Sequence, residues 1–273
     1  GRYPAILDHP EKGKHARELF DDAQAMLKKI INEKMLQAQA VVGFFPSNSV
    51  DYDDINIYTD EQRTKVQLHL LGIRQLMVIL GAPNLCLSDY LQPESNGIAD
   101  YIGAFIVTTG IGIEDKLAEF EADHDDYNSI MLKAMADRLA EAFAELMHKK
   151  VRRELWAYAP DEELTNDELI AEKYQGIRPA PGYPACPDHT EKALLWQLLE
   201  ADERSEVTLT DSYAMYPASA VSGFYFAHPD ARYFGTGRIG QNQIEDYARR
   251  KGMTKGEAER WLAPVLGYEP DDS

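Results

Sequence analysis

The sequence predicts an α+β protein with a largely antiparallel sheet and flanking helices. Helical patterns stand at both ends of the chain, strand patterns gather in groups, and strands and helices do not alternate regularly. There is no internal repeat and no Pro/Ser-rich linker among the 273 residues. We therefore expect one domain that spans residues 1–273.

The first half of the chain supplies a helix and several strands. Apolar side chains recur at spacings of three and four over residues 11–36, which predicts an amphipathic helix. The segments AVVGFFP (residues 40–46) and DINIY (residues 54–58) are typical of strands. Residues 65–80 fit either a strand or a helix. The segment DYIGAFIVTTG (residues 100–110) predicts a buried strand that ends in glycine.

The middle of the chain is mostly helical. Residues 115–155 predict helix, and their apolar stripe should face the core: Ile130, Met131, Ala134, Leu139, Phe143, Leu146 and Met147. Two capping boxes follow, Thr165 with Glu168 and Asp188 with Glu191, and each predicts a helix start.

The last third begins with three aromatic-rich segments. SYAMYP (residues 212–217), SGFYFAHP (residues 222–229) and RYFGTG (residues 232–237) are strand candidates separated by turn residues. Residues 241–251 and 254–261 predict two closing helices.

Composition excludes several classes of function. The chain has 46 acidic and 28 basic residues, and its net charge of -18 repels a phosphate backbone, so we expect no nucleic-acid partner. Since no apolar run approaches the ~20 residues that span a bilayer, we expect no membrane insertion. Two cysteines fit a reducing compartment and predict a cytoplasmic protein. The first residue is Gly1, so we expect a fragment or a processed chain.

The short motifs have ordinary structural explanations. TTGIGIED follows a strand and precedes a helix but lacks the third glycine of a dinucleotide loop, so we interpret it as a turn. Cys186 and His189 form only half of a zinc site, and we expect no metal. Since no nucleophile stands with a base at a suitable spacing, we expect no catalytic residue.

The segment GIRPAPGYPACPDHTEK (residues 176–192) is the strongest candidate for a ligand site. It has four prolines between Pro179 and Pro187, which predict a stiff, mostly extended path with Gly182 as its soft joint. Such a path can present the amides of Ala180, Gly182, Tyr183, Ala185 and Cys186 to the edge of a heterocycle. Arg178 adds a planar fork for a carboxylate or phosphate. A ligand-binding loop is favoured over a buried turn.

The motif R-x-x-x-G-Y, here Arg178 to Tyr183, resembles the signature of the C-terminal reactivation domain of cobalamin-dependent methionine synthase. The likeness continues over nearly the whole chain and in the same order, in ADYIGAFIVTTG, HDDYNSIMLKAMADRLAEAFAE, VSGFYFAHPDARYF, DYARRKGM and ERWLAPVLGY. It implies a single α+β unit with a curved antiparallel sheet that binds S-adenosylmethionine.

The resemblance also implies which residues hold the ligand. Arg178 would pair with the carboxylate of the methionine moiety, and Ala180 and its neighbours would contact the adenine through their backbone. The implied binding set is Arg178, Ala180, Gly182, Tyr183, Tyr233, Phe234, Glu172 and Glu141. Alternatively, Tyr233 is an ordinary sheet aromatic and the two glutamates are solvated. The family pattern begins before Gly1 with an aspartate that contacts the ligand, so affinity measured on this chain is expected to be lower.

The implied reaction is the reductive methylation of cob(II)alamin. Cobalamin would be bound by a neighbouring module of the same enzyme, zinc would belong only to another module, and the electron would come from flavodoxin or a flavoprotein reductase. The basic run HKKVRRE (residues 148–154) and the segment near Arg2 are candidate docking patches for this donor.

Two alternatives remain open. The first is a module that senses S-adenosylmethionine without methyl transfer, which would bind the ligand but form no methylcobalamin. The second is a free-standing methyltransferase for an external acceptor. It would turn over without cobalamin, and the missing glycine-rich nucleotide loop disfavours it.

Overall fold

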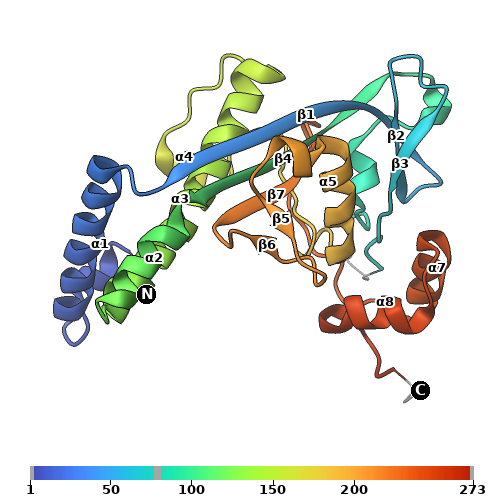
Figure 1. Cartoon of the computed structure of the whole chain (residues 1–273). Helices are drawn as coiled ribbons and strands as arrows, with labels where there is room; N and C mark the ends of the chain where they lie inside the picture. The colour runs from blue at the N-terminus through green and yellow to red at the C-terminus, as the bar shows by residue number, and fades with distance from the viewer. Residues whose placement is uncertain (1–2, 77–80, 271–273) are drawn as a thin grey trace.

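The computed structural model describes residues 3–76 and 81–270 and confirms the α+β class. Its centre is a five-stranded antiparallel sheet in the order β3-β2-β1-β4-β7 (Figure 1). The strands are β1 (Gln37–Val50), β2 (Asp54–Tyr58), β3 (Val66–Leu70), β4 (Asp100–Ile111) and β7 (Ala220–Tyr225). Two short strands, β5 (Thr208–Leu209) and β6 (Met215–Tyr216), form a separate pair.

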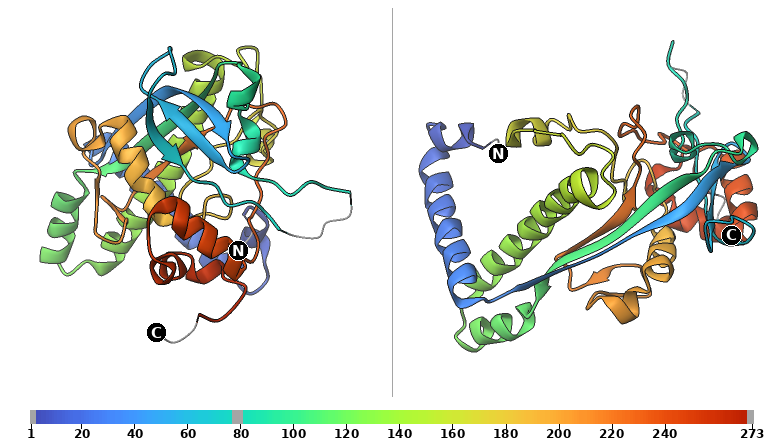
Figure 2. Two further views of the ribbon diagram at one scale, coloured as in Figure 1. Left: turned by 90° about the vertical axis from the view of Figure 1, so that its right-hand side faces the viewer. Right: turned by 90° about the horizontal axis from the view of Figure 1, so that it is seen from above.

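The long strands β1 and β4 form the twisted ribbon that runs through the molecule (Figures 1 and 2). Strand β4 is buried on both faces because its alternating side chains enter two different cores. Ile102, Ala104 and Ile106 pack in the core that contains the leucines of α5 (Lys192–Leu199). Phe105 and Val107 pack in the core formed with α3 (Asp126–Lys150).

Helices cover the two faces and both ends of this ribbon (Figure 2). Helix α3 lies on one face and α5 on the other. Helices α1 (Gly13–Glu33) and α2 (Ile113–Ala122) lie at one end, whereas α7 (Gln241–Lys251) and α8 (Lys255–Trp261) lie at the other (Figure 1). The short helices are α4 (Asn166–Ile170) and α6 (Ala201–Arg204).

The core-facing stripe predicted for α3 was partly wrong. Ile130, Ala134 and Leu146 are exposed, and the buried line is Leu132, Ala136, Ala140, Ala144 and His148. These residues recur every four positions, so they share one face of the helix. Alanine side chains let this face approach β4 closely, and the hydroxyl of Thr109 on β4 donates to the carbonyl of Ala136 at 2.8 Å.

Most other elements agree with the sequence, but residues 232–237 form no strand. The segment 65–80, which fitted either a strand or a helix, contains β3, and its residues 77–80 lie outside the described part. Of the two glycines in TTGIGIED, Gly110 belongs to β4, and Gly112 forms the turn that caps the start of α2 with φ +85°. Within the described residues, no helix combines the length and the apolar character needed to cross a bilayer.

Candidate functional site

The proline-rich segment forms a strap (residues 176–187) along the open edge of β7. Ile177 and Phe226 exchange backbone hydrogen bonds of 3.0 Å, and the amide of Phe224 donates to the carbonyl of Pro179 at 2.9 Å. Gly223 makes this approach possible, because a Cβ at that position would lie 2.6 Å from the Pro179 oxygen. The first half of the strap is therefore extended, as the sequence predicted.

The second half of the strap turns back on itself, so the prediction of a mostly extended path was wrong beyond Ala180. The amide of Gly182 donates to Cys186 O at 2.7 Å, and the amide of Cys186 donates to Tyr183 O at 2.9 Å. The amide of Tyr183 also bonds within the turn, to Ala180 O at 3.2 Å. Of the five amides predicted to face a ligand, only those of Ala180 and Ala185 have no hydrogen-bond acceptor in the described part of the chain.

Gly182 adopts the backbone conformation that the turn requires. Its φ is +92°, which is unfavourable for residues with a Cβ, and a Cβ here would lie 2.1 Å from the ring of His189. The glycine of the motif thus lets the strap fold over the imidazole.

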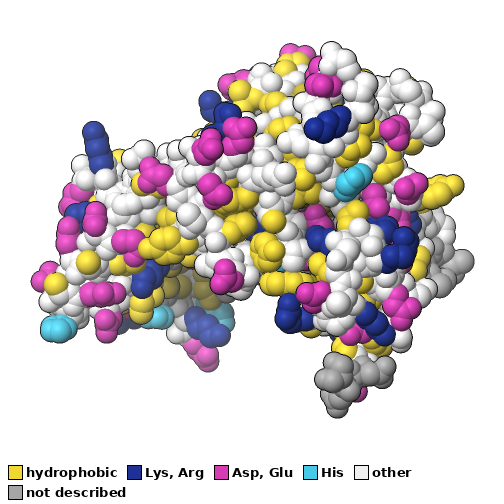
Figure 3. Space-filling view, turned by 45° about the vertical axis from the view of Figure 1, so that its right-hand side comes forward, with side chains coloured by type: hydrophobic (Ala, Val, Ile, Leu, Met, Phe, Trp, Pro, Cys, Tyr) yellow, Lys and Arg dark blue, Asp and Glu magenta, His cyan; other side chains and the backbone are white. Residues whose placement is uncertain are grey.

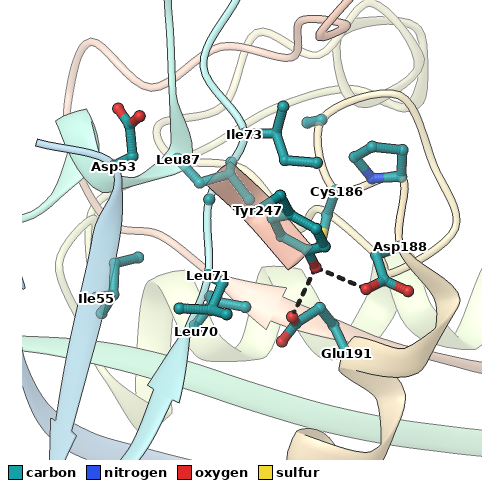
Figure 4. Close-up of a pocket in the computed structure, with 13 residues that line it drawn as sticks. Asp53, Ile55, Leu70, Leu71, Ile73, Leu87, Cys186, Asp188, Glu191 and Tyr247 are labelled. Atoms are coloured by element: carbon teal, nitrogen blue, oxygen red, sulfur yellow. Dashed lines mark hydrogen bonds between the residues drawn. The ribbon is translucent and has the colours of Figure 1, made fainter. Parts of the chain in front are cut away.

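A buried polar cluster anchors the end of the strap to α7 (Figure 4). The hydroxyl of Tyr247 lies 2.6 Å from Asp188 Oδ2 and 3.1 Å from Glu191 Oε1, and Lys251 pairs with both carboxylates. Although burial opposes ionisation, Lys251 and the hydrogen bonds lower the pKa of Asp188. The predicted capping box at this position was wrong, because Glu191 binds α7 and only Asp188 caps, accepting from the amide of Thr190.

A pocket of about 290 Å³ opens beside the strap and brings most of the predicted site together. Seven of the eight predicted residues line it: Glu141, Glu172, Arg178, Ala180, Tyr183, Tyr233 and Phe234. Gly182 does not line it and acts through the shape of the turn. The remaining lining residues are Phe105, Pro179, Pro184, Ala185 and Val221.

Three side chains that the sequence did not predict as site residues form an ion pair or hydrogen bonds with the guanidinium of Arg178. Its Nη2 lies 2.7 Å from Glu145 Oε2, and its Nη1 lies 3.0 Å from the hydroxyl of Tyr174 and 3.1 Å from His148 Nδ1. Its backbone amide donates to the hydroxyl of Tyr233 at 3.0 Å, which joins the two predicted ligand segments. Burial is the main cause that raises the pKa of Tyr174, so its hydroxyl stays protonated.

Two comparisons relate this chain to known proteins. A family model described as the activation domain of vitamin B12-dependent methionine synthase matches residues 1–252. The chain belongs to this activation-domain family. A crystal structure of the MetH reactivation domain bound to AdoHcy is 55% identical to this chain, with a TM-score of 0.93. The match covers 98% of this chain and 82% of that one.

Only part of the basic run of this activation domain lies at the surface. His148 and Arg152 are buried, and Arg152 forms a bidentate pair with Glu162 at 2.8–3.0 Å. Lys150 pairs with Glu154 on the surface. Arg2, near the other expected patch, lies outside the described residues. On the face shown in Figure 3, acidic and basic side chains are interspersed.

The activation domain also shows what local sequence patterns could reveal. Glu141, Glu145 and His148 occur at spacings of four and three on α3, so they project from one side of the helix. Tyr174 precedes Arg178 by four residues. No group of three or more His, Cys, Asp or Glu residues suited to a metal ion occurs in the described part of the chain.

Proposed function

We propose that this chain binds S-adenosylmethionine in the strap pocket and presents its methyl group for the reductive methylation of cob(II)alamin. The observation that carries the proposal is the convergence of seven predicted residues on one pocket. The pocket volume lies near the lower end of the range for small-molecule sites. This activity would make the chain the methyltransferase module that reactivates cobalamin-dependent methionine synthase.

The lining residues fit the chemical groups of the ligand. Arg178 would bind the carboxylate, and the amides of Ala180 and Ala185 would meet the edge of the adenine between aromatic side chains such as Phe234. Glu141 and Glu172 would place negative charge near the sulfonium. When bound, the ligand supplies an electrophilic methyl group, and the electrons of the broken C–S bond stay on sulfur.

The contribution of the protein is placement rather than acid–base chemistry. A rigid strap that holds the base and the carboxylate leaves the methyl end accessible to a corrin carried by the neighbouring module. Positioning of this kind can lower a barrier by up to ~7–11 kcal/mol when a bimolecular step becomes intramolecular. The electron would come from flavodoxin or a flavoprotein reductase, and zinc would belong to another module. Two free, buried cysteines support a cytoplasmic setting.

Arg178→Ala tests the binding mode. The variant loses a charge-assisted pair with the carboxylate, so the binding free energy should weaken by about 2–4 kcal/mol, a roughly 30- to 700-fold rise in Kd. Calorimetric titration with S-adenosylmethionine measures it. Arg204→Ala is the control, because Arg204 is an exposed arginine on α6 that does not line the pocket. Unchanged affinity in folded Arg178→Ala would contradict the proposal.

The methyl-transfer step needs a separate measurement. The chain joined to its cobalamin module, given cob(II)alamin, S-adenosylmethionine and a one-electron reductant, should form methylcobalamin. Binding without methylcobalamin would instead indicate a sensing module.

A further inference from the structure

His148 lies in the core directly behind Arg178. Its side chain has no exposed surface. The ring stacks on Tyr225 with centroids 5.1 Å apart and planes 19° apart, and it meets Tyr174 edge-on at 4.9 Å. Nδ1 lies 3.1 Å from Nη1 of Arg178, and Nε2 lies 3.4 Å from the hydroxyl of Tyr158. The imidazole therefore has one fixed orientation and contacts the arginine that would bind the ligand carboxylate.

The hydrogen bonds define the protonation state of this ring. A guanidinium has only donors, so Nδ1 must accept from Arg178 and must carry no proton. The single ring proton is then on Nε2, facing the hydroxyl of Tyr158. Burial, and then the charges of Arg152 and Arg178, hold the pKa of His148 well below its ordinary value. His148 is thus a neutral acceptor between two cations.

This acceptor helps to fix which donors of Arg178 remain for a ligand. The two Nη1 hydrogens are donated to His148 Nδ1 and to the hydroxyl of Tyr174, and one Nη2 hydrogen faces the carboxylate of Glu145. The Nε–H and the second Nη2 hydrogen have no acceptor among the described residues, and the side chain lines the pocket. An arginine held in this way loses less side-chain entropy when it binds a carboxylate.

We propose that neutral His148 is a positioning residue for recognition of the ligand carboxylate. It fixes the guanidinium of Arg178 so that the Nε–H and one Nη2 hydrogen stay directed to the ligand. This inference rests on the proposed function, because it assumes that the ligand carries a carboxylate that Arg178 binds.

Two substitutions of equal size separate the acceptor from the packing. His148→Asn keeps an oxygen that can accept near the position of Nδ1, whereas His148→Leu has the same shape and no acceptor. Each loses the ring stack on Tyr225 to the same extent. His69→Phe on β3 is the control for a histidine substitution outside the site, because His69 is exposed and does not line the pocket. It should leave the affinity for both ligands unchanged.

The readout is calorimetric binding of two ligands, S-adenosylmethionine and its decarboxylated form, which lacks only the carboxylate. We expect His148→Leu to bind S-adenosylmethionine about 10-fold more weakly than His148→Asn, as for one lost charge-assisted hydrogen bond. The Kd of the decarboxylated ligand should agree within about 2-fold in the two variants, because that ligand makes no bond to Arg178.

Three results would overturn the inference. Equal affinity of the two variants for S-adenosylmethionine would show that the acceptor does not matter. An equal loss for both ligands would show that His148 only supports the pocket. A wild-type protein that binds the two ligands equally well would show that Arg178 does not read the carboxylate. If the wild type binds neither ligand, the proposed function itself fails, and that result is distinct from the other three.

Discussion

At the scale of single residues, Gly182 is the position where backbone geometry most directly shapes the site. Gly182→Ala places a Cβ 2.1 Å from the His189 ring at φ +92°, so the turn must open. We expect a loss of roughly 2–4 kcal/mol in the free energy of unfolding, from strain and overpacking together. Urea denaturation measures it. Gly252→Ala is the matched control, with φ +73° and open space, and it should cost only about 1 kcal/mol. Equal losses would show that the contact with His189 is unimportant.

The buried imidazole of His148 should make the free energy of unfolding depend on pH. The pKa of His148 is lowered in the folded protein. Below about pH 6.5, His148 therefore binds a proton in the unfolded chain but not in the folded chain. The free energy of unfolding should therefore fall, by up to about 1.4 kcal/mol per pH unit, as pH drops from 6.5 toward the folded-state pKa. Urea denaturation at pH 8, 7, 6 and 5 should show a steeper fall for the wild type than for His148→Leu. Parallel curves would contradict a buried neutral histidine.

Some site residues can be recognised from their own local sequence, whereas others can be assigned to the site only when the packing of α3 is known. Arg178 and Gly182 could be predicted because their roles depend on neighbouring residues in the sequence. Arg178 carries a guanidinium next to a proline-rich segment, and Gly182 is the one glycine between Pro179 and Pro187. Glu145 and His148 contact Arg178 only because α3 packs against β4 in one particular rotation. That rotation depends on small alanines, which carry little signal in a pattern of apolar residues. The support of the arginine was therefore missed.

At the scale of elements, buried charge holds α7 to the residues that directly follow the strap. Lys251→Met would leave Asp188 and Glu191 buried without their cation, which should cost about 3–5 kcal/mol in the free energy of unfolding. Lys255→Met on α8 is the control, since its pairs with Glu245 and Glu259 are more exposed and should contribute less than ~1 kcal/mol. Chemical denaturation at neutral pH compares them. A loss below that of the control would show that the cluster tolerates an unpaired carboxylate.

Elements were predictable where their boundary signals are local. The helices at 241–251 and 255–261 have period, caps and flanking glycine or threonine within a few residues, and the structure places them at those positions. The aromatic segment at 232–237 gave the opposite result. Residues 232–237 pair with no described strand. Instead, the hydroxyl of Tyr233 accepts from the amide of Arg178, and the ring of Phe234 packs edge-on against Tyr90 with centroids 6.3 Å apart. Aromatic residues suit a strand and a pocket equally well, so composition alone could not separate the two.

At the scale of the whole molecule, the site lies between separate cores. Phe105 in the pocket wall belongs to the core under α3, whereas Ala185 and Phe234 belong to the core around α5. Strand β4 contributes to both, so the pocket floor is tied to the most deeply buried strand. A third cluster holds α1 and α2 against α3, and a fourth holds α7 and α8. Rigidity should therefore decrease from the site toward the two ends of the ribbon.

Amide hydrogen exchange tests this gradient. Helix α1 buries only Gly13, Met26 and Ile30 among its 21 residues, whereas every residue of β4 from Ile102 to Gly110 is buried. Because local opening exposes little apolar surface at α1, its amides should exchange at least about 100-fold faster than those of β4. Mass spectrometry of the wild-type chain at neutral pH resolves the two segments. If the amides of α1 and β4 exchanged at similar rates, the end of the ribbon would open only when the whole protein unfolds. Rigidity would then be uniform along the ribbon, and the position of the strap pocket beside β4 would give it no additional rigidity.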